Sequence, residues 1–110
     1  MRDGATDKIR ALNDDARRHF TGCRVFITPG IAALGNKAVA EVLRQVRTYD
    51  DFTEDNDPYA EHDFGAFHHG DVQVFWKWDY FDLDLKMLSP DPSDDAITAR
   101  VLTIMLADEY

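Results

Sequence analysis

The sequence predicts a single α+β domain over residues 1–110, with elements in the order α-β-α-β-β-α and a three-stranded, mainly antiparallel sheet packed by helices. Three observations lead to this class. Some segments carry apolar residues three and four positions apart, as a helix does. Between them lie short segments that either have apolar residues at every second position or are rich in β-favouring residues. Turn-forming residues separate these segments. The length is that of one ordinary domain, and no linker or repeat divides it.

The first half of the chain is expected to form two helices around one short strand. A helix over about residues 7–20 is indicated by apolar side chains on one face, with Thr6 as the N-cap and Gly22 as the stop. The segment CRVFIT, residues 23–28, is short and rich in β-favouring residues, so it is expected to be a strand. The following GIAALG fits either a loop or a short helical turn.

A second helix is predicted from Asn36, its possible cap, to about Tyr49. Residues 50–61, DDFTEDNDPYAE, are expected to be a loop because Asn, Asp and Pro favour turns. A hairpin follows, with strands over residues 64–68 and 72–81. In its second strand one face is apolar and aromatic, formed by Val72, Val74, Trp76, Trp78 and Tyr80.

The last predicted element is a buried helix that begins near Asp91 and runs through Leu106. Asp91 is placed to cap it, Pro92 suits the first helical position, and two further aspartates lie at the positive end of the helix dipole. The remainder is apolar over most of its circumference, which favours a central position in the domain.

Charge is divided unevenly along the chain, whose net charge is −9. Residues 1–47 hold nine Lys or Arg against five Asp or Glu, whereas residues 48–110 hold three against sixteen. Phosphates would be repelled by the acidic half, so we expect no direct contact with nucleic acid. No apolar run reaches the roughly 20 residues that cross a membrane, and Cys23 is the only cysteine, so we expect a cytoplasmic protein.

Three stretches together resemble a known family: DFTEDNDPYAEHDFGAF, VFWKWDYFDLDL and SPDPSDDAITARVLTIMLADEY. They are similar to the bacterial, mostly alphaproteobacterial, domain of unknown function 3768 family, and the resemblance covers nearly the whole chain. It implies no activity and no catalytic residues. It suggests that members often sit on plasmids and other mobile elements, which favours an accessory role such as anti-defence or regulation.

The leading hypothesis is a non-catalytic protein without a cofactor that presents an acidic surface to a basic partner. If the acids share one face, they would imitate the phosphates of a duplex and occupy the basic groove of a nucleic-acid-binding enzyme. A solvated face that keeps the protein soluble is the plain alternative. The residues expected to contact the partner are Asp50, Asp51, Glu54, Asp55, Asp57 and Glu61.

Two further hypotheses remain open at this point. A divalent metal ion could be held by His62, Asp63 and Asp79 and activate water for hydrolysis, although no recognised ligand spacing is present. Alternatively, His62 or Asp63 hydrogen-bonds the backbone and anchors the acidic loop. A homo-oligomer is also possible, in which the basic first half of one chain meets the acidic second half of another.

Overall fold

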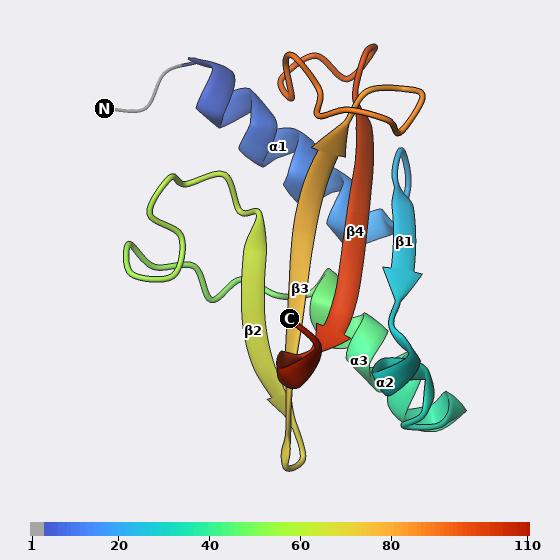
Figure 1. The fold of residues 1–110 in the computed structure, drawn as a ribbon. Helices are drawn as coiled ribbons and strands as arrows, with labels where there is room; N and C mark the ends of the chain where they lie inside the picture. Colours follow the sequence, from blue (N-terminus) through green and yellow to red (C-terminus); the bar gives the residue numbers. More distant parts are fainter. Residues whose placement is uncertain (1–3) are drawn as a thin grey trace.

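The structure is a computed structural model, and it describes residues 4–110. Its centre is a four-stranded sheet in the order β1-β4-β3-β2 (Figure 1). The strands are β1 (Arg24–Ile27), β2 (Phe64–His69), β3 (Val72–Phe81) and β4 (Ala99–Leu106). β1 runs parallel to β4, and the other two pairs are antiparallel, so the sheet is mixed.

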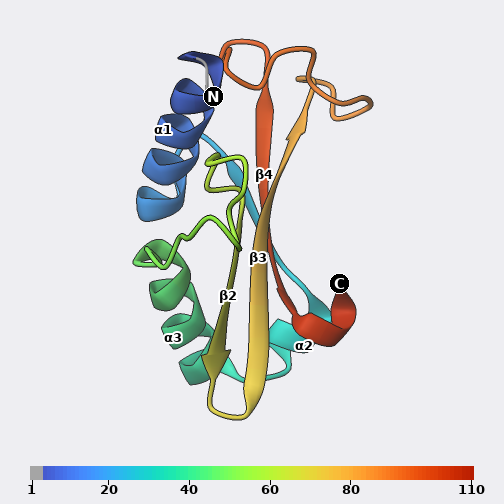
Figure 2. The same cartoon turned by 90° about the vertical axis from the view of Figure 1, so that its left-hand side faces the viewer.

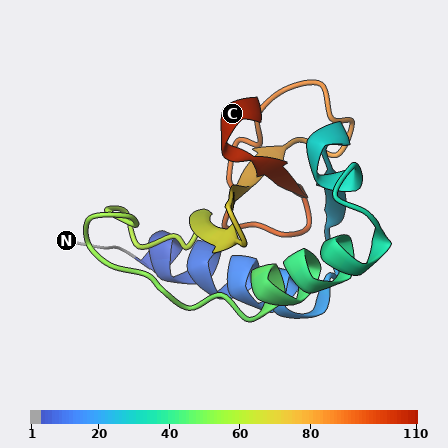
Figure 3. The same cartoon turned by 90° about the horizontal axis from the view of Figure 1, so that it is seen from below.

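The two long helices cover one face of this sheet (Figure 2). They are α1 (Gly4–His19) and α3 (Asn36–Arg47), and the short α2 (Pro29–Ala32) joins β1 to α3. The C-terminal 3₁₀ turn η1 (Ala107–Glu109) lies on the opposite side of the sheet from α1 and α3 (Figure 3). Within residues 4–110, none of the helices combines the length and the apolar character that a membrane crossing requires.

The core lies between the helices and the face of β3 that the sequence predicted to be apolar. Val74, Trp76 and Trp78 are buried there and pair in register with β4. Gly65 lies opposite Trp76 on β2, where a larger side chain would collide with the indole ring. The Trp76 ring therefore limits how closely β2 approaches the core.

Most of the predicted elements are confirmed, with small differences at their ends. The first helix, the strand within residues 23–28, the helix from Asn36, the loop and the hairpin are all present. The predicted caps are wrong: Thr6 lies inside α1, and Gly35 rather than Asn36 precedes α3 as its N-cap. The hairpin turn is formed by Gly70, with a positive φ of 60°, and Asp71.

The prediction of a last helix is wrong, because residues 99–106 form β4 and make the sheet four-stranded rather than three-stranded. β4 is paired on both sides and buried along most of its length, so its sequence is mainly apolar, apart from Arg100 and Thr103, and does not alternate between apolar and polar side chains. The supposed cap has another role. Asp91 accepts a hydrogen bond from the backbone N–H of Ser93 and closes a local turn.

Candidate functional site

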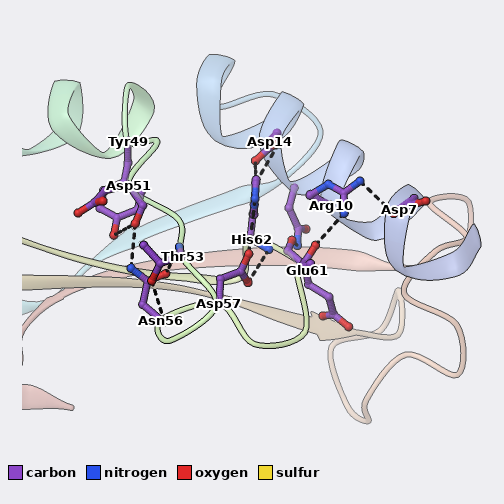
Figure 4. Close-up of polar contacts among 12 residues, drawn as sticks. Asp7, Arg10, Asp14, Tyr49, Asp51, Thr53, Asn56, Asp57, Glu61 and His62 are labelled. Carbon is purple, nitrogen blue, oxygen red and sulfur yellow. Dashed lines mark hydrogen bonds and ion pairs between the residues drawn. The ribbon is translucent and has the colours of Figure 1, made fainter. Parts of the chain in front are cut away.

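The chain between α3 and β2 forms a folded loop that lies against α1 (Figure 4). We call residues 50–63 the acidic loop, since seven of its side chains are Asp or Glu and none is Lys or Arg. Two of its carbonyl oxygens accept hydrogen bonds from α1. Arg10 Nη1 donates to Ala60 O at 3.1 Å, and Asn13 Nδ2 donates to Glu61 O at 3.1 Å. The far end of the loop is therefore tied to the first helix.

His62 is the main side-chain anchor of the acidic loop. Its Nδ1 lies 2.8 Å and 3.0 Å from the two carboxylate oxygens of Asp14 on α1. Its Nε2 lies 3.5 Å from Asp57 Oδ2, and its backbone N–H donates to Asp57 Oδ1 at 3.2 Å. The imidazole also stacks on Phe52, with ring centroids 3.6 Å apart and an angle of 3° between the planes. Both ring nitrogens thus face carboxylates inside the fold.

Arg17 binds the backbone at the end of α3, just before the acidic loop begins. Its side chain is fully buried, and Nη1 donates to the carbonyl oxygens of Val46 at 2.8 Å and Tyr49 at 2.9 Å. Nη2 donates to Asp14 at 3.2 Å, and the guanidinium carbon lies 4.9 Å from the centre of the Trp76 ring. Burial lowers the pKa of Arg17. Asp14 is consequently shared between a buried arginine and His62, which joins the two anchors into one network.

A second buried network lies beside the first. Asn13 Nδ2 donates to Tyr80 Oη at 2.8 Å, and Tyr80 Oη donates to Glu61 Oε1 at 3.2 Å. Arg100 Nε donates to Asn13 Oδ1 at 3.0 Å. Burial raises the pKa of the Glu61 carboxyl and of the Tyr80 hydroxyl. α1, the loop, β3 and β4 therefore meet at the amide of Asn13.

The middle of the loop is closed by Asn56. Its Oδ1 accepts from the backbone N–H of Thr53 at 2.8 Å, and its Nδ2 donates to the carbonyl oxygen of Asp51 at 2.8 Å. The backbone N–H of Asp57 donates to Thr53 O at 2.8 Å. These bonds give residues 51–57 a defined shape that does not depend on the anchors to α1.

The six residues predicted to contact a partner divide into two groups. Four are exposed: Asp50, Asp51, Glu54 and Asp55. Asp57 is buried against His62, and Glu61 is half-buried against Tyr80, so these two carboxylates hold the loop in place. A hollow of about 840 Å³ lies beside them, lined by loop residues such as Glu54 and Tyr59.

The predicted metal ligands are engaged in other contacts. His62 faces Asp14 and Asp57, and Asp79 forms an ion pair with Lys77. Asp63 is half-buried; burial first, and then the nearby carboxylates, raise the pKa of its carboxyl group. Across residues 4–110, no three side chains from His, Cys, Asp and Glu are arranged to hold a metal ion. His62 instead anchors the loop, as the other role left open by the sequence expects, but its side chain contacts the carboxylates of Asp14 and Asp57 rather than the backbone.

The residues of α1 that hydrogen-bond to the loop and to the chain just before it were not predicted from the sequence. Asn13 and Arg17 lie on the same helical face as Ile9 and Ala16, which are buried in the apolar core. Polar side chains on the apolar face of a helix must find partners when they are buried. That pattern was the available signal, and it would have pointed to a polar contact between α1 and a distant segment.

Comparison with protein families gives a match. The family described as "Protein of unknown function (DUF3768)" matches residues 27–109. The chain belongs to this family. The matched range contains the acidic loop and strands β2, β3 and β4, whereas Asn13, Asp14 and Arg17 lie before it. No curated protein and no solved structure matches the chain.

Proposed function

We propose that this member of the domain of unknown function 3768 family is a non-catalytic binding protein that presents its acidic loop to a basic partner. The partner is a nucleic-acid-binding protein whose basic groove receives the loop in place of phosphates. An anti-defence or other accessory role on a mobile element follows if that partner is a defence enzyme. The observation that carries this proposal is the set of exposed carboxylates on a loop fixed by two buried networks.

The fixed shape of the loop matters because it lowers the cost of binding. A flexible acidic segment would lose conformational entropy when it docks, whereas a preorganised loop has already lost it on folding. Phe52 is held by stacking against His62 and by an edge contact with Trp76. The neighbouring carboxylates of Asp51 and Glu54 are therefore carried on a segment that is anchored at both ends.

The exposed charges are also unneutralised. Among the residues that the structure describes, Asp50, Asp51, Glu54 and Asp55 take part in no ion pair. Lys and Arg are absent between Thr48 and Trp76. The negative electrostatic potential of these carboxylates is therefore not cancelled by nearby cations, and it can attract a basic surface and steer its approach.

The contacts of His62 favour binding over hydrolysis. A general base needs an imidazole nitrogen within reach of a substrate proton. Here one nitrogen faces Asp14 and the other faces Asp57. The side chain thereby holds the loop, and the exposed charged side chains of the loop are carboxylates alone.

A competition assay tests the proposal. A fluorescent DNA duplex is bound to each of several basic DNA-binding proteins, including restriction endonucleases, and displacement by the chain is followed by anisotropy. We expect displacement of the duplex from at least one of them, weakening as salt rises. No displacement from any of these proteins would contradict the proposal.

Two matched variants separate the effect of the loop charges on binding from the effect of net charge. The triple variant D51N/E54Q/D55N removes three exposed charges from the loop, and D15N/D71N/D108N removes three from exposed positions elsewhere. Each exposed ion pair is worth about 0.2–1 kcal/mol, so the loop variant should bind about 3-fold to 150-fold more weakly. The control variant should lose much less. Equal losses in the two variants would show that only the net charge matters.

A further inference from the structure

A second feature of the surface is independent of the acidic loop. Residues 82–88, which we call the tip, follow β3 and fold back so that Leu88 bridges to Phe81. Three of its apolar side chains are strongly exposed: Leu83 at 60%, Met87 at 71% and Leu88 at 75%. A group of exposed apolar side chains in so short a segment marks an interaction surface.

The tip has a defined shape. The backbone N–H of Asp82 donates to Met87 O at 2.8 Å, and Asp82 Oδ1 accepts from the N–H of Lys86 at 3.0 Å. Leu85 adopts a positive φ of 60°, a conformation that a leucine holds only when its surroundings require it. The apolar side chains are therefore presented by a closed turn with a mainly acidic rim, formed by Asp82 and Asp84 against Lys86.

A groove with the complementary character lies beside α3. Its volume is about 740 Å³, and its apolar lining includes Leu34, Ala38 and Ala40. Its positive charges are Lys37, Arg44 and Arg47. The one carboxylate of the lining, Glu41, is bound to Arg44 Nε at 3.0 Å. The groove thus combines apolar side chains with a net positive rim.

The tip and the groove lie at opposite ends of the molecule. In Figures 1 and 2 the segment after β3 lies at one end of the sheet, whereas α3 and the turn between β2 and β3 lie toward the other. They are therefore not in contact within one chain. A second copy of the chain can supply the missing half of each, with apolar surface meeting apolar surface and an acidic rim meeting a basic one.

We propose that the tip of one copy docks in the α3 groove of another copy. The two surfaces are different, so the contact is heterologous and runs head to tail. Each pair leaves one free tip and one free groove, and further copies can add until a ring closes. The contact is small, so the association is weak and depends on protein concentration.

The first test is the molar mass of the whole chain in low salt. Light scattering should show a mass that rises as the concentration increases to about 1 mM, and a smaller rise in high salt. The tip variant L83S/M87S and the groove variant K37E/A40E change only exposed positions. Each should stay monomeric, while the control K8E/A11E makes the same chemical changes as the groove variant on exposed positions of α1 and should associate like the wild type.

The decisive test mixes the two defective variants. The groove variant still has an intact tip, and the tip variant still has an intact groove. An equimolar mixture should therefore form a dimer and nothing larger. A wild type that stays monomeric, a mixture that stays monomeric, or a defective variant that associates on its own would overturn the proposal. Thermal melts of each variant establish that its fold is retained.

Discussion

Replacing Asn13 by leucine tests the polar network that joins the acidic loop to the sheet. Asn13 is fully buried and makes three side-chain hydrogen bonds, one of them from the charged guanidinium of Arg100. Leucine keeps much of the side-chain volume, but it can form none of the three hydrogen bonds that the amide makes. A hydrogen bond to a charged group is worth about 1.5–3 kcal/mol and a neutral one about 0.5–1.5, so Asn13→Leu should lower the free energy of unfolding by about 2.5–6 kcal/mol.

The assay is equilibrium unfolding in urea at neutral pH, with the free energy extrapolated to water. The control is Asn36→Leu, since Asn36 is an exposed amide at the start of α3 and the same substitution there should stay within about 0.5 kcal/mol of the wild type. If Asn13→Leu also stayed within about 1 kcal/mol of the wild type, the network would not hold the domain together as described.

Three further outcomes are expected. Gly65→Ala should destabilise the domain by about 1–3 kcal/mol in urea unfolding, because the added methyl group collides with the buried Trp76 indole, whereas Gly4→Ala meets no neighbour and should cost nothing. Asp63→Asn should raise the melting temperature at pH 7, and Asp71→Asn should not. Burial raises the pKa of the folded Asp63 carboxyl, so its contribution to stability is present below its ordinary pKa and is lost as the pH rises through the folded value. The advantage of Asp63→Asn should therefore vanish below about pH 4, and a benefit that is constant with pH would contradict this cause. Finally, Zn²⁺, Mn²⁺ or Mg²⁺ should leave the melting temperature unchanged, because within residues 4–110 no three side chains from His, Cys, Asp and Glu are arranged to hold a metal ion. A rise of several degrees that a chelator removes would support the hypothesis of a metal-dependent hydrolase instead.

The hairpin could be predicted because its information is local. Val74, Trp76 and Trp78 alternate with polar or half-buried residues, and a turn with glycine separates the two strands. A strand that is covered on one face more than on the other shows this alternation of apolar and more polar residues in its own sequence. The same holds for α1 and α3, whose apolar side chains recur with the period of a helix.

β4 could not be predicted in the same way, because its environment is set by distant segments. β1 and β3 pair with its two edges, and side chains on both faces are buried. Such a strand has no polar face, and its apolar run cannot be told from a buried helix by periodicity alone. Val101, Thr103 and Ile104 are β-branched and favour a strand, but Asp91 and Pro92 gave a strong signal for a helix start.

The site was predictable only in part. The segment with the acids and its loop character follow from composition, since Asn, Asp and Pro favour turns and Lys and Arg are missing. Which carboxylates point outward depends on α1, whose Asp14 lies 48 residues before His62 in the chain. Asp57 turns inward because His62 lies between it and Asp14. No spacing within the loop encodes that contact.

We expect the acidic loop to be fixed already before any partner binds. Backbone ¹⁵N relaxation of the free protein measures this directly for residues 51–57 and 60–63. The two buried networks and the bonds of Asn56 predict order parameters of about 0.8 or above, close to those of β3. Values below about 0.6 across these residues would show a flexible acidic segment and would contradict a preorganised loop.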